Sequence, residues 1–124
     1  MFLGTYQLGF SGKNRVVLPK KIRQALLGSG IVLTKGLDGC IWGFGNEDFE
    51  REAEKQLEIP IRTDEGRVLR RMFFSEAEAV ELDKQGRFVI PRPLLAFAKI
   101  GKEVLLLGAG DHFEIWNPQI LASL

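Results

Sequence analysis

The chain carries one short pattern twice, and this internal repeat limits its fold more than any other feature of the sequence. The two segments are "SGKNRVVLP", residues 11–19, and "DKQGRFVIP", residues 83–91. Each has a polar residue, an arginine four positions later, three apolar residues and a proline. The shift of 72 residues that superimposes them also places Lys20 on Arg92 and Ile22 on Leu94. Because a repeated segment marks a repeated structural unit, the chain is predicted to be a duplication.

A second matching pair of segments follows the first in the same order. The segment "IVLTKGLDGCIW", residues 31–42, matches "EVLLLGAGDHFEIW", residues 103–116, with a small gap. Both segments end in the same Ile-Trp dipeptide. Because the matches run through most of the chain without a change of order, we predict two homologous halves, residues 1–60 and residues 62–124.

Each half is predicted to contain four short strands. Apolar residues alternate loosely at 5–10 and 78–83, which indicates a first strand in each half. The β-branched segments that follow each arginine predict a second strand. The matching segments at 31–44 and 103–116 have turn residues between two apolar stretches, which is typical of a β-hairpin.

Helices are predicted between and after these strands. A proline has no N–H to donate to a β-ladder but suits the first turn of a helix, so helices are expected after Pro19 and Pro91. A longer helix is expected to begin at Asn46, and another is expected to be capped by Thr63 or Asp64. The last residues, 117–124, form a shorter helical segment than the first half has at the same place.

These elements predict an α+β, β-rich fold in which two tandem β-units share one small sheet with flanking helices. About 60 residues are too few to bury a stable core alone. A single barrel-like sheet built by both halves would solve that problem. Its remaining exposed edges would favour association with further copies of the chain.

Composition and charge indicate an intracellular protein with two oppositely charged regions. No apolar segment approaches the roughly 20 residues that span a membrane, and the N-terminal residues do not resemble a signal peptide, so we expect no membrane partner. The single cysteine, Cys40, fits the reducing cytoplasm. The net charge is only +1, but residues 13–23 hold five basic residues and no acid, whereas residues 47–58 hold six acids. A positive face and a negative face are therefore expected.

The sequence offers little for catalysis or for a bound cofactor. His112 is the single histidine, and no nucleophilic residue stands at a sequence spacing typical of a catalytic motif, so no enzyme activity is expected. One cysteine and one histidine cannot form a metal site on their own, and the acids of 47–58 are spread around their helix. The segment "GFSGKN" lacks the glycine spacing and the hydroxyl of a phosphate loop. Trp42 and Trp116, at matching positions, are interpreted as core or subunit-contact residues.

The two repeated arginines are the strongest functional candidates. Arg15 and Arg87 each stand at the start of a strand, directly after a polar turn. The planar guanidinium can donate two hydrogen bonds to a guanine edge or to a phosphate. An ion pair between Asp83 and Arg87 is the structural alternative, and both roles are compatible if the carboxylate orients the arginine. The neighbouring lysines are candidates for phosphate contacts without sequence preference, namely Lys13, Lys20 and Lys84.

The duplicated "DKQGRFVIP" unit, the N-terminal "MFLGTY" and the two Ile-Trp segments together resemble the MraZ family of the SpoVT-AbrB superfamily. The resemblance implies two SpoVT-AbrB-like repeats, residues 1–60 and 62–124. It also implies a DNA-binding transcriptional regulator of the bacterial division and cell-wall gene cluster, one that binds repeated promoter boxes as a ring of subunits. The family's contact motif, Asp followed four positions later by Arg, is complete in Asp83–Arg87. In the first half, Ser11 and Asn14 depart from the motif and only Arg15 matches.

The resulting hypothesis is a cytoplasmic, nucleoid-associated, homo-oligomeric regulator that binds double-stranded DNA and needs no cofactor or small-molecule substrate. Its expected DNA contacts are Lys13, Arg15, Lys20, Asp83, Lys84 and Arg87. The alternative is an oligomeric protein-interaction scaffold that does not bind DNA. In that alternative the acidic helix and the tryptophans contact a protein partner, and the arginines form internal ion pairs.

Overall fold

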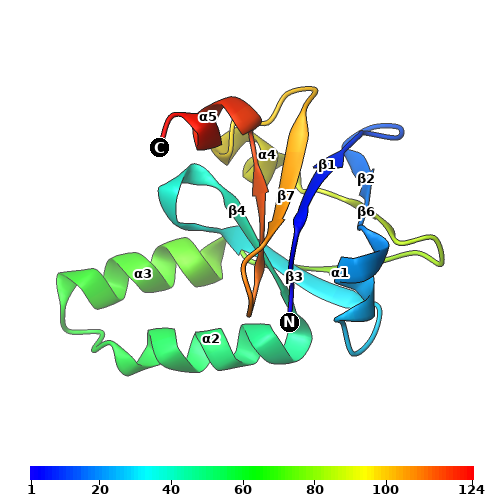
Figure 1. Cartoon of the computed structure of the whole chain (residues 1–124). Coiled ribbons are helices and arrows are strands. Elements are labelled where there is room, and N and C mark those ends of the chain that lie inside the picture. Colours follow the sequence, from blue (N-terminus) through cyan, green and yellow to red (C-terminus); the bar gives the residue numbers. More distant parts are fainter.

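The computed structural model describes all residues, 1–124, and shows the predicted duplication as a repeated order of elements (Figure 1). The first half contains β1 (Thr5–Leu8), β2 (Arg15–Val17), α1 (Lys20–Gln24), β3 (Gly30–Lys35), the 3-10 turn η1 (Leu37–Gly39), β4 (Ile41–Gly45) and α2 (Asn46–Glu58). A linking helix, α3 (Asp64–Ser75), follows. The same order of strands and helices then recurs as β5 (Glu78–Glu81), β6 (Arg87–Val89), α4 (Arg92–Phe97), β7 (Val104–Gly108), β8 (Phe113–Trp116) and α5 (Pro118–Ala122).

The main sheet is shared by the two halves, as predicted, and its strands are exchanged between them. Six strands pair in the order β1-β7-β8-β4-β3-β5, and every pair is antiparallel. The first strand of each half therefore pairs with the hairpin of the other half: β1 with β7, and β5 with β3. The order reads the same when the halves are exchanged, so the sheet has a pseudo-twofold axis between β4 and β8.

The predicted barrel-like closure of this sheet is wrong. The sheet is open, because β1 and β5 lie at its two ends and do not pair with each other. The physical reason is that β2 and β6 leave the main sheet and pair only with each other. This two-stranded ribbon covers one face of the open sheet, so its core is closed by a second layer instead of by a continuous barrel.

The core lies between the main sheet and the β2–β6 ribbon. Val16 and Phe88, the central residues of the ribbon, are directly opposite each other and point inward, with 0% and 2% of their surface exposed. They pack in one apolar cluster with buried residues of both halves, such as Ile31, Leu106 and Ile115. The ribbon is therefore fixed on its inner side, while its outer side faces away from the core.

The helices α2 and α3 form an antiparallel pair on the side of the molecule away from the ribbon (Figure 1). Of the two predicted caps, Thr63 and Asp64, the structure has Thr63, whose hydroxyl accepts a hydrogen bond from the N–H of Gly66 at 3.0 Å. Arg70 of α3 donates to the carbonyls of Leu57 and Ile59 at the end of α2. No helix has the length and apolar character needed to cross a lipid bilayer.

Candidate nucleic-acid interface

The turn before β6 holds Arg87 through the carboxylate of Asp83. One oxygen of Asp83 accepts hydrogen bonds from the backbone N–H groups of Gln85 and Arg87, both at 2.9 Å. The other accepts from Nε of Arg87 at 2.6 Å. The backbone N–H of Arg87 and then its side chain lower the pKa of Asp83 below its usual value. The predicted ion pair is thus present, and it leaves the outer nitrogens of the guanidinium available to a ligand.

The turn before β2 is closed by the same backbone hydrogen bond but has a left-handed glycine, Gly12, and a different acceptor for its arginine. The N–H of Ser11 donates to the carbonyl of Arg15 at 2.8 Å, as the N–H of Asp83 does to that of Arg87 at 3.0 Å. Nε of Arg15 donates to the backbone carbonyl of Ser11 at 3.0 Å. A carbonyl oxygen therefore takes the place of the missing carboxylate, and Arg15 is oriented without an ion pair.

The β2–β6 pairing brings the arginines of the two halves onto one exposed face. Arg15 lies opposite Val89, and Val17 lies opposite Arg87. Residues directly opposite, and residues two apart on one strand, share a face of a β-ribbon. Because Val16 and Phe88 occupy the inner face, all four of these side chains are on the outer face. The sequence predicted both arginines but did not predict that they would be adjacent.

The three predicted lysines surround this face as exposed cations. Lys13 and Lys84 lie in the two turns, and Lys20 is the first residue of α1. None of them forms an ion pair within the chain. Asp83 is the single acid within the two repeated segments, and its charge is already directed at Arg87. The face therefore has a local excess of positive charge, which favours a polyanion.

Sequence reasoning missed two further basic residues beside the turns. Arg23 of α1 packs over Gly86, since a Cβ added there would lie 2.6 Å from Cδ of Arg23. Arg23 has no ion pair, and its buried Nε has no hydrogen-bond partner. Arg92 is exposed at the start of α4, where the first half has Lys20. The repeat already aligned Arg92 with Lys20, but nothing local placed Arg23 against the other half's turn.

Comparison with known proteins gives the same assignment along nearly the whole chain. The family model described as "MraZ protein, putative antitoxin-like" matches residues 1–72 and 73–121. The chain is 41% identical over 119 residues to the transcriptional regulator MraZ of Roseiflexus castenholzii, covering 96% of this chain and 82% of that protein. The chain belongs to the MraZ family. Its MraZ relatives in Clostridium tetani and Lactiplantibacillus plantarum, also named transcriptional regulators, are 38% and 37% identical, with 82% and 84% of their lengths covered.

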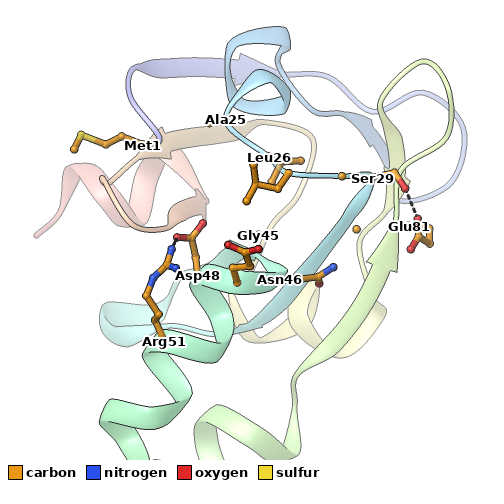
Figure 2. A pocket seen from close by; sticks show the side chains of 13 residues that line it. Met1, Ala25, Leu26, Ser29, Gly45, Asn46, Asp48, Arg51 and Glu81 are labelled. Carbon is orange, nitrogen blue, oxygen red and sulfur yellow. Dashed lines mark hydrogen bonds and ion pairs between the residues drawn. The ribbon is translucent and has the colours of Figure 1, made fainter.

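A cleft of this MraZ-family chain lies away from the ribbon and has acidic walls. It measures about 520 Å³ and lies between the end of α1 and the start of α2 (Figure 2). Two of the carboxylates that line it already have partners. Asp48 is paired with Arg51, and Glu81 accepts a hydrogen bond from Ser29 Oγ at 2.7 Å. Glu47 adds a further negative charge at its wall. The cleft is thus unsuited to a phosphate, unlike the face that carries the arginines.

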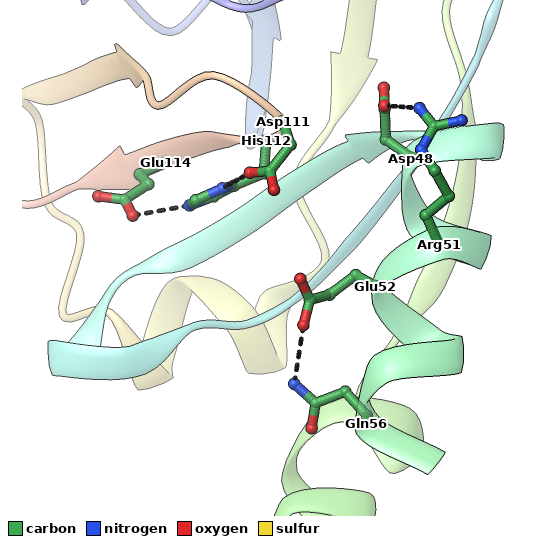
Figure 3. Close-up of polar contacts among 7 residues, drawn as sticks. All are labelled: Asp48, Arg51, Glu52, Gln56, Asp111, His112 and Glu114. Atoms are coloured by element: carbon green, nitrogen blue, oxygen red, sulfur yellow. Dashed lines mark hydrogen bonds and ion pairs between the residues drawn. The ribbon is translucent and has the colours of Figure 1, made fainter. Parts of the chain in front are cut away.

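A second polar cluster of the MraZ fold surrounds His112, directly before β8 (Figure 3). Its Nδ1 lies 2.8 Å from Asp111 and its Nε2 lies 2.9 Å from Glu114, so both ring nitrogens face carboxylates. Burial alone would lower the pKa of His112, but the hydrogen bonds to Glu114 and Asp111 outweigh burial and raise it. Glu114 also accepts from Trp116 Nε1 at 2.9 Å. The histidine is thus held between two carboxylates, one of which also bonds Trp116.

Proposed function

We propose that this MraZ-family chain regulates transcription by binding specific sequences in double-stranded DNA, and that it is not an enzyme. The observation that carries the proposal is the pairing of β2 with β6, which places Arg15 and Arg87 on one exposed, positively charged face. The transcriptional-regulator names of its relatives agree with this role.

The β2–β6 ribbon would enter the major groove with its outer face toward the bases. The groove is about 12 Å wide and admits a two-stranded β-ribbon. The free guanidinium nitrogens of Arg15 and Arg87 would donate to O6 and N7 of guanine, and the Asp83 carboxylate would hold Arg87 in position. Phosphate contacts would come from the surrounding cations, which are Lys13, Lys20 and Lys84 together with Arg23 and Arg92.

The assembled form would be a ring-shaped homo-oligomer that binds repeated promoter boxes of the division and cell-wall gene cluster, at the nucleoid in the cytoplasm. The two open sheet edges, β1 and β5, and the exposed apolar residues of the α2–α3 pair support self-association. One ribbon makes few base contacts. Several ribbons that engage repeated boxes would gain avidity through their high effective concentration.

The scaffold alternative is not favoured by the positions of the tryptophans. Trp116 is only 3% exposed, and its indole N–H is bonded to Glu114. Trp42 is half-buried and packs against the His112 ring, with 4.8 Å between the ring centroids. The Trp116 indole is therefore engaged within the chain, and the Trp42 indole N–H is buried without a hydrogen-bond partner. The acidic helix α2 remains a solvated surface of the same molecule.

Fluorescence anisotropy with duplex DNA tests the proposal. The probe is the region upstream of the protein's own gene, with a scrambled duplex as reference, at two salt concentrations. We expect affinity to fall steeply with salt and to favour the upstream region, because phosphate contacts release counterions and base contacts discriminate. Equal binding to both duplexes, or no binding, would contradict the proposal.

Single arginine variants then locate the contact. Arg15→Ala or Arg87→Ala should lower the ratio of specific to scrambled affinity about 10-fold or more, since a bidentate arginine–guanine pair gives about 1–3 kcal/mol of discrimination. Both variants should keep the oligomeric mass of the parent. The matched control is Arg71→Ala, an exposed arginine of α3 on the other side of the molecule. Its discrimination should equal that of the parent protein.

A further inference from the structure

The outer face of the β2–β6 ribbon carries two valines as well as two arginines. Val17 is 41% exposed and Val89 is 52% exposed. The exposure pattern along the strands is identical in the two halves: a half-buried arginine, a buried apolar residue and an exposed valine. An exposed β-branched pair at the centre of a basic face is therefore a property of both repeats.

The ladder gives each arginine a valine neighbour in two directions. Along one strand, Arg15 and Val17 are separated by two residues, about 6–7 Å. Across the ribbon, Arg15 faces Val89 with about 5 Å between the Cα atoms. The arrangement around Arg87 is the same, with Val89 along the strand and Val17 across. The four positions thus form a square in which arginine and valine alternate, and Nε of each arginine is turned back toward Ser11 or Asp83.

Nothing in the chain covers these valines, and a second copy of the ribbon is a poor cover. Face-to-face packing of two ribbons would bring four guanidinium groups together. The nearby Asp83 is already bonded to Arg87, so it could not neutralise the other cations. The occupant that fits the square must therefore offer hydrogen-bond acceptors to the arginines and an apolar group to the valines within a few ångströms.

The major groove of DNA offers that combination. Guanine presents two acceptors there, and the 5-methyl group of thymine is the apolar group on the base edges. We propose that Val17 and Val89 are specificity-determining residues that pack against thymine methyl groups next to the guanines bound by Arg15 and Arg87. This inference rests on the proposed DNA-binding function and adds a second base to the readout.

The spacing of the ribbon fixes where the thymine should be. Successive base pairs are about 3.4 Å apart along the helix axis. Valines about 5–7 Å from an arginine therefore reach a base one or two steps from the guanine. A binding site for this chain should contain guanine and thymine at that separation.

Replacing thymine by deoxyuridine tests the inference, because this removes the methyl group and keeps the base pairing. The full-length protein first selects its preferred duplex from a random pool. Each thymine of that duplex is then replaced singly. We expect at least one thymine within two steps of a guanine to lose about three- to fivefold in affinity, the value of burying one methyl group. That loss should disappear in Val17→Ala or Val89→Ala.

Two controls separate the contact from a change in folding. Val17→Thr and Val89→Thr keep the branched shape of valine but replace one of its two methyl groups by a hydroxyl, so they should reduce the preference for thymine over deoxyuridine only in part. Val68→Ala removes an exposed valine of α3, 57% exposed, and should leave that preference unchanged. Unfolding followed by circular dichroism should show parent-like stability for all of these variants.

The outcomes distinguish the role of the two valines from the DNA-binding function itself. Specific binding without any sensitivity to the methyl group, or a selected site without thymine near guanine, would overturn the valine assignment and leave the DNA-binding function standing. Absence of any sequence preference would overturn both. A methyl effect that persists in the valine variants would also overturn the assignment.

Discussion

The two arginine turns join the ribbon in the same way but differ in their backbone and in how they hold their arginines. Gly12 of the first turn is left-handed, with φ 74°, and the bond from the Gly86 N–H to the Asp83 carbonyl exists only in the second turn. The cross-ribbon bonds are symmetric: Leu18 N–H donates to the Gly86 carbonyl and Ile90 N–H donates to the Asn14 carbonyl, both at 2.8 Å. In the second half, a carboxylate receives the arginine Nε; in the first half, a backbone carbonyl receives it. The turn that lacks the carboxylate instead contains a left-handed glycine, Gly12.

This difference indicates what the aspartate adds. A charged acceptor that also receives two backbone N–H groups orders the arginine more strongly than one carbonyl does. Ordering before binding lowers the entropy that a side chain loses when it binds a ligand. The second half therefore has the more preorganised arginine, whereas the first half has an arginine in the same place with more freedom.

The largest expected effect comes from separating the halves. Residues 1–60 and 62–124 produced as separate chains should show no folded monomer, since β1 pairs with β7 and β5 pairs with β3. Circular dichroism and amide NMR spectra over a range of concentrations check this. Any structure in one half should depend on concentration, because a second copy can supply the missing strand. A half that unfolds cooperatively as a monomer would contradict the strand exchange.

The next effect concerns the residue before each arginine, which has a positive φ in both turns: 60° at Asn14 and 80° at Gly86. Gly86→Ala should reduce the free energy of unfolding by about 2–3 kcal/mol, because the backbone is left-handed and a Cβ would meet Arg23. Asn14→Ala should cost only about 1 kcal/mol. Denaturant unfolding measures both.

A double variant separates the two causes at Gly86. Adding Arg23→Ala to Gly86→Ala removes the clash but not the backbone strain, so part of the stability should return. If Arg23→Ala restores nothing, then Arg23 does not pack on the turn as the structure shows.

The repeat made much of the fold predictable, because each element could be supported by its counterpart. The eight strands, the two hairpins and the Thr63 cap follow from local patterns such as proline after a β-branched segment. The exchange of strands did not follow. Whether β1 pairs with its own hairpin or with the other half's hairpin depends on long-range packing, which alternation of apolar residues does not encode.

The candidate site was predictable where a side chain carries the chemistry and unpredictable elsewhere. Asp83 and Arg87 could be paired from their spacing alone. The acceptor of Arg15 could not be predicted, because every residue has a backbone carbonyl and the sequence does not show which one an arginine will contact. Arg23 was missed for a related reason: it comes from α1 of the first half but covers a turn of the second.

A moderate effect on DNA discrimination is expected from replacing the residues that hold the two arginines, Asp83 and Ser11. Asp83→Ala should lower the ratio of specific to scrambled DNA affinity about three- to tenfold, since an unrestrained arginine loses more conformational freedom on binding. Absolute affinity for scrambled DNA should rise, because a negative charge is removed. Ser11→Ala should change the ratio less than about twofold, because the carbonyl acceptor is retained.

The reverse substitution sharpens the comparison. Ser11→Asp gives the first turn the missing carboxylate and should raise discrimination, with Arg15→Ala added as the control that abolishes the gain. Equal effects of Asp83→Ala and Ser11→Ala would show that the carboxylate does not preorganise Arg87.

The smallest expected effect is on stability and concerns the two hairpins. They differ in the charge of the residue that directly precedes the Ile-Trp dipeptide. The first has Cys40 there, whose pKa is raised to about 12 by burial and the nearby acids Glu114 and Asp38, so it is neutral. The second has Glu114, whose pKa is lowered first by its hydrogen bond to His112. The charged cluster of Asp111, His112 and Glu114 therefore belongs to the second half alone, and its contribution to stability should depend on pH.

Because the pKa of His112 in the folded protein is raised above 6.5, its contribution is fully present below pH 6.5 and is lost as pH rises through the raised value. Asp111 and Glu114, with lowered pKa values, contribute above their usual 3.8 and 4.5 and lose that contribution in acid. The stability difference between the parent and His112→Gln should therefore be largest between about pH 5 and 6.5 and shrink as pH rises through the raised pKa of His112. NMR titration of the single histidine checks the cause directly. A pKa at or below 6.5 would mean that the two carboxylates do not hold the ring in its charged form, since two acceptors satisfy both ring nitrogens only when each carries a proton.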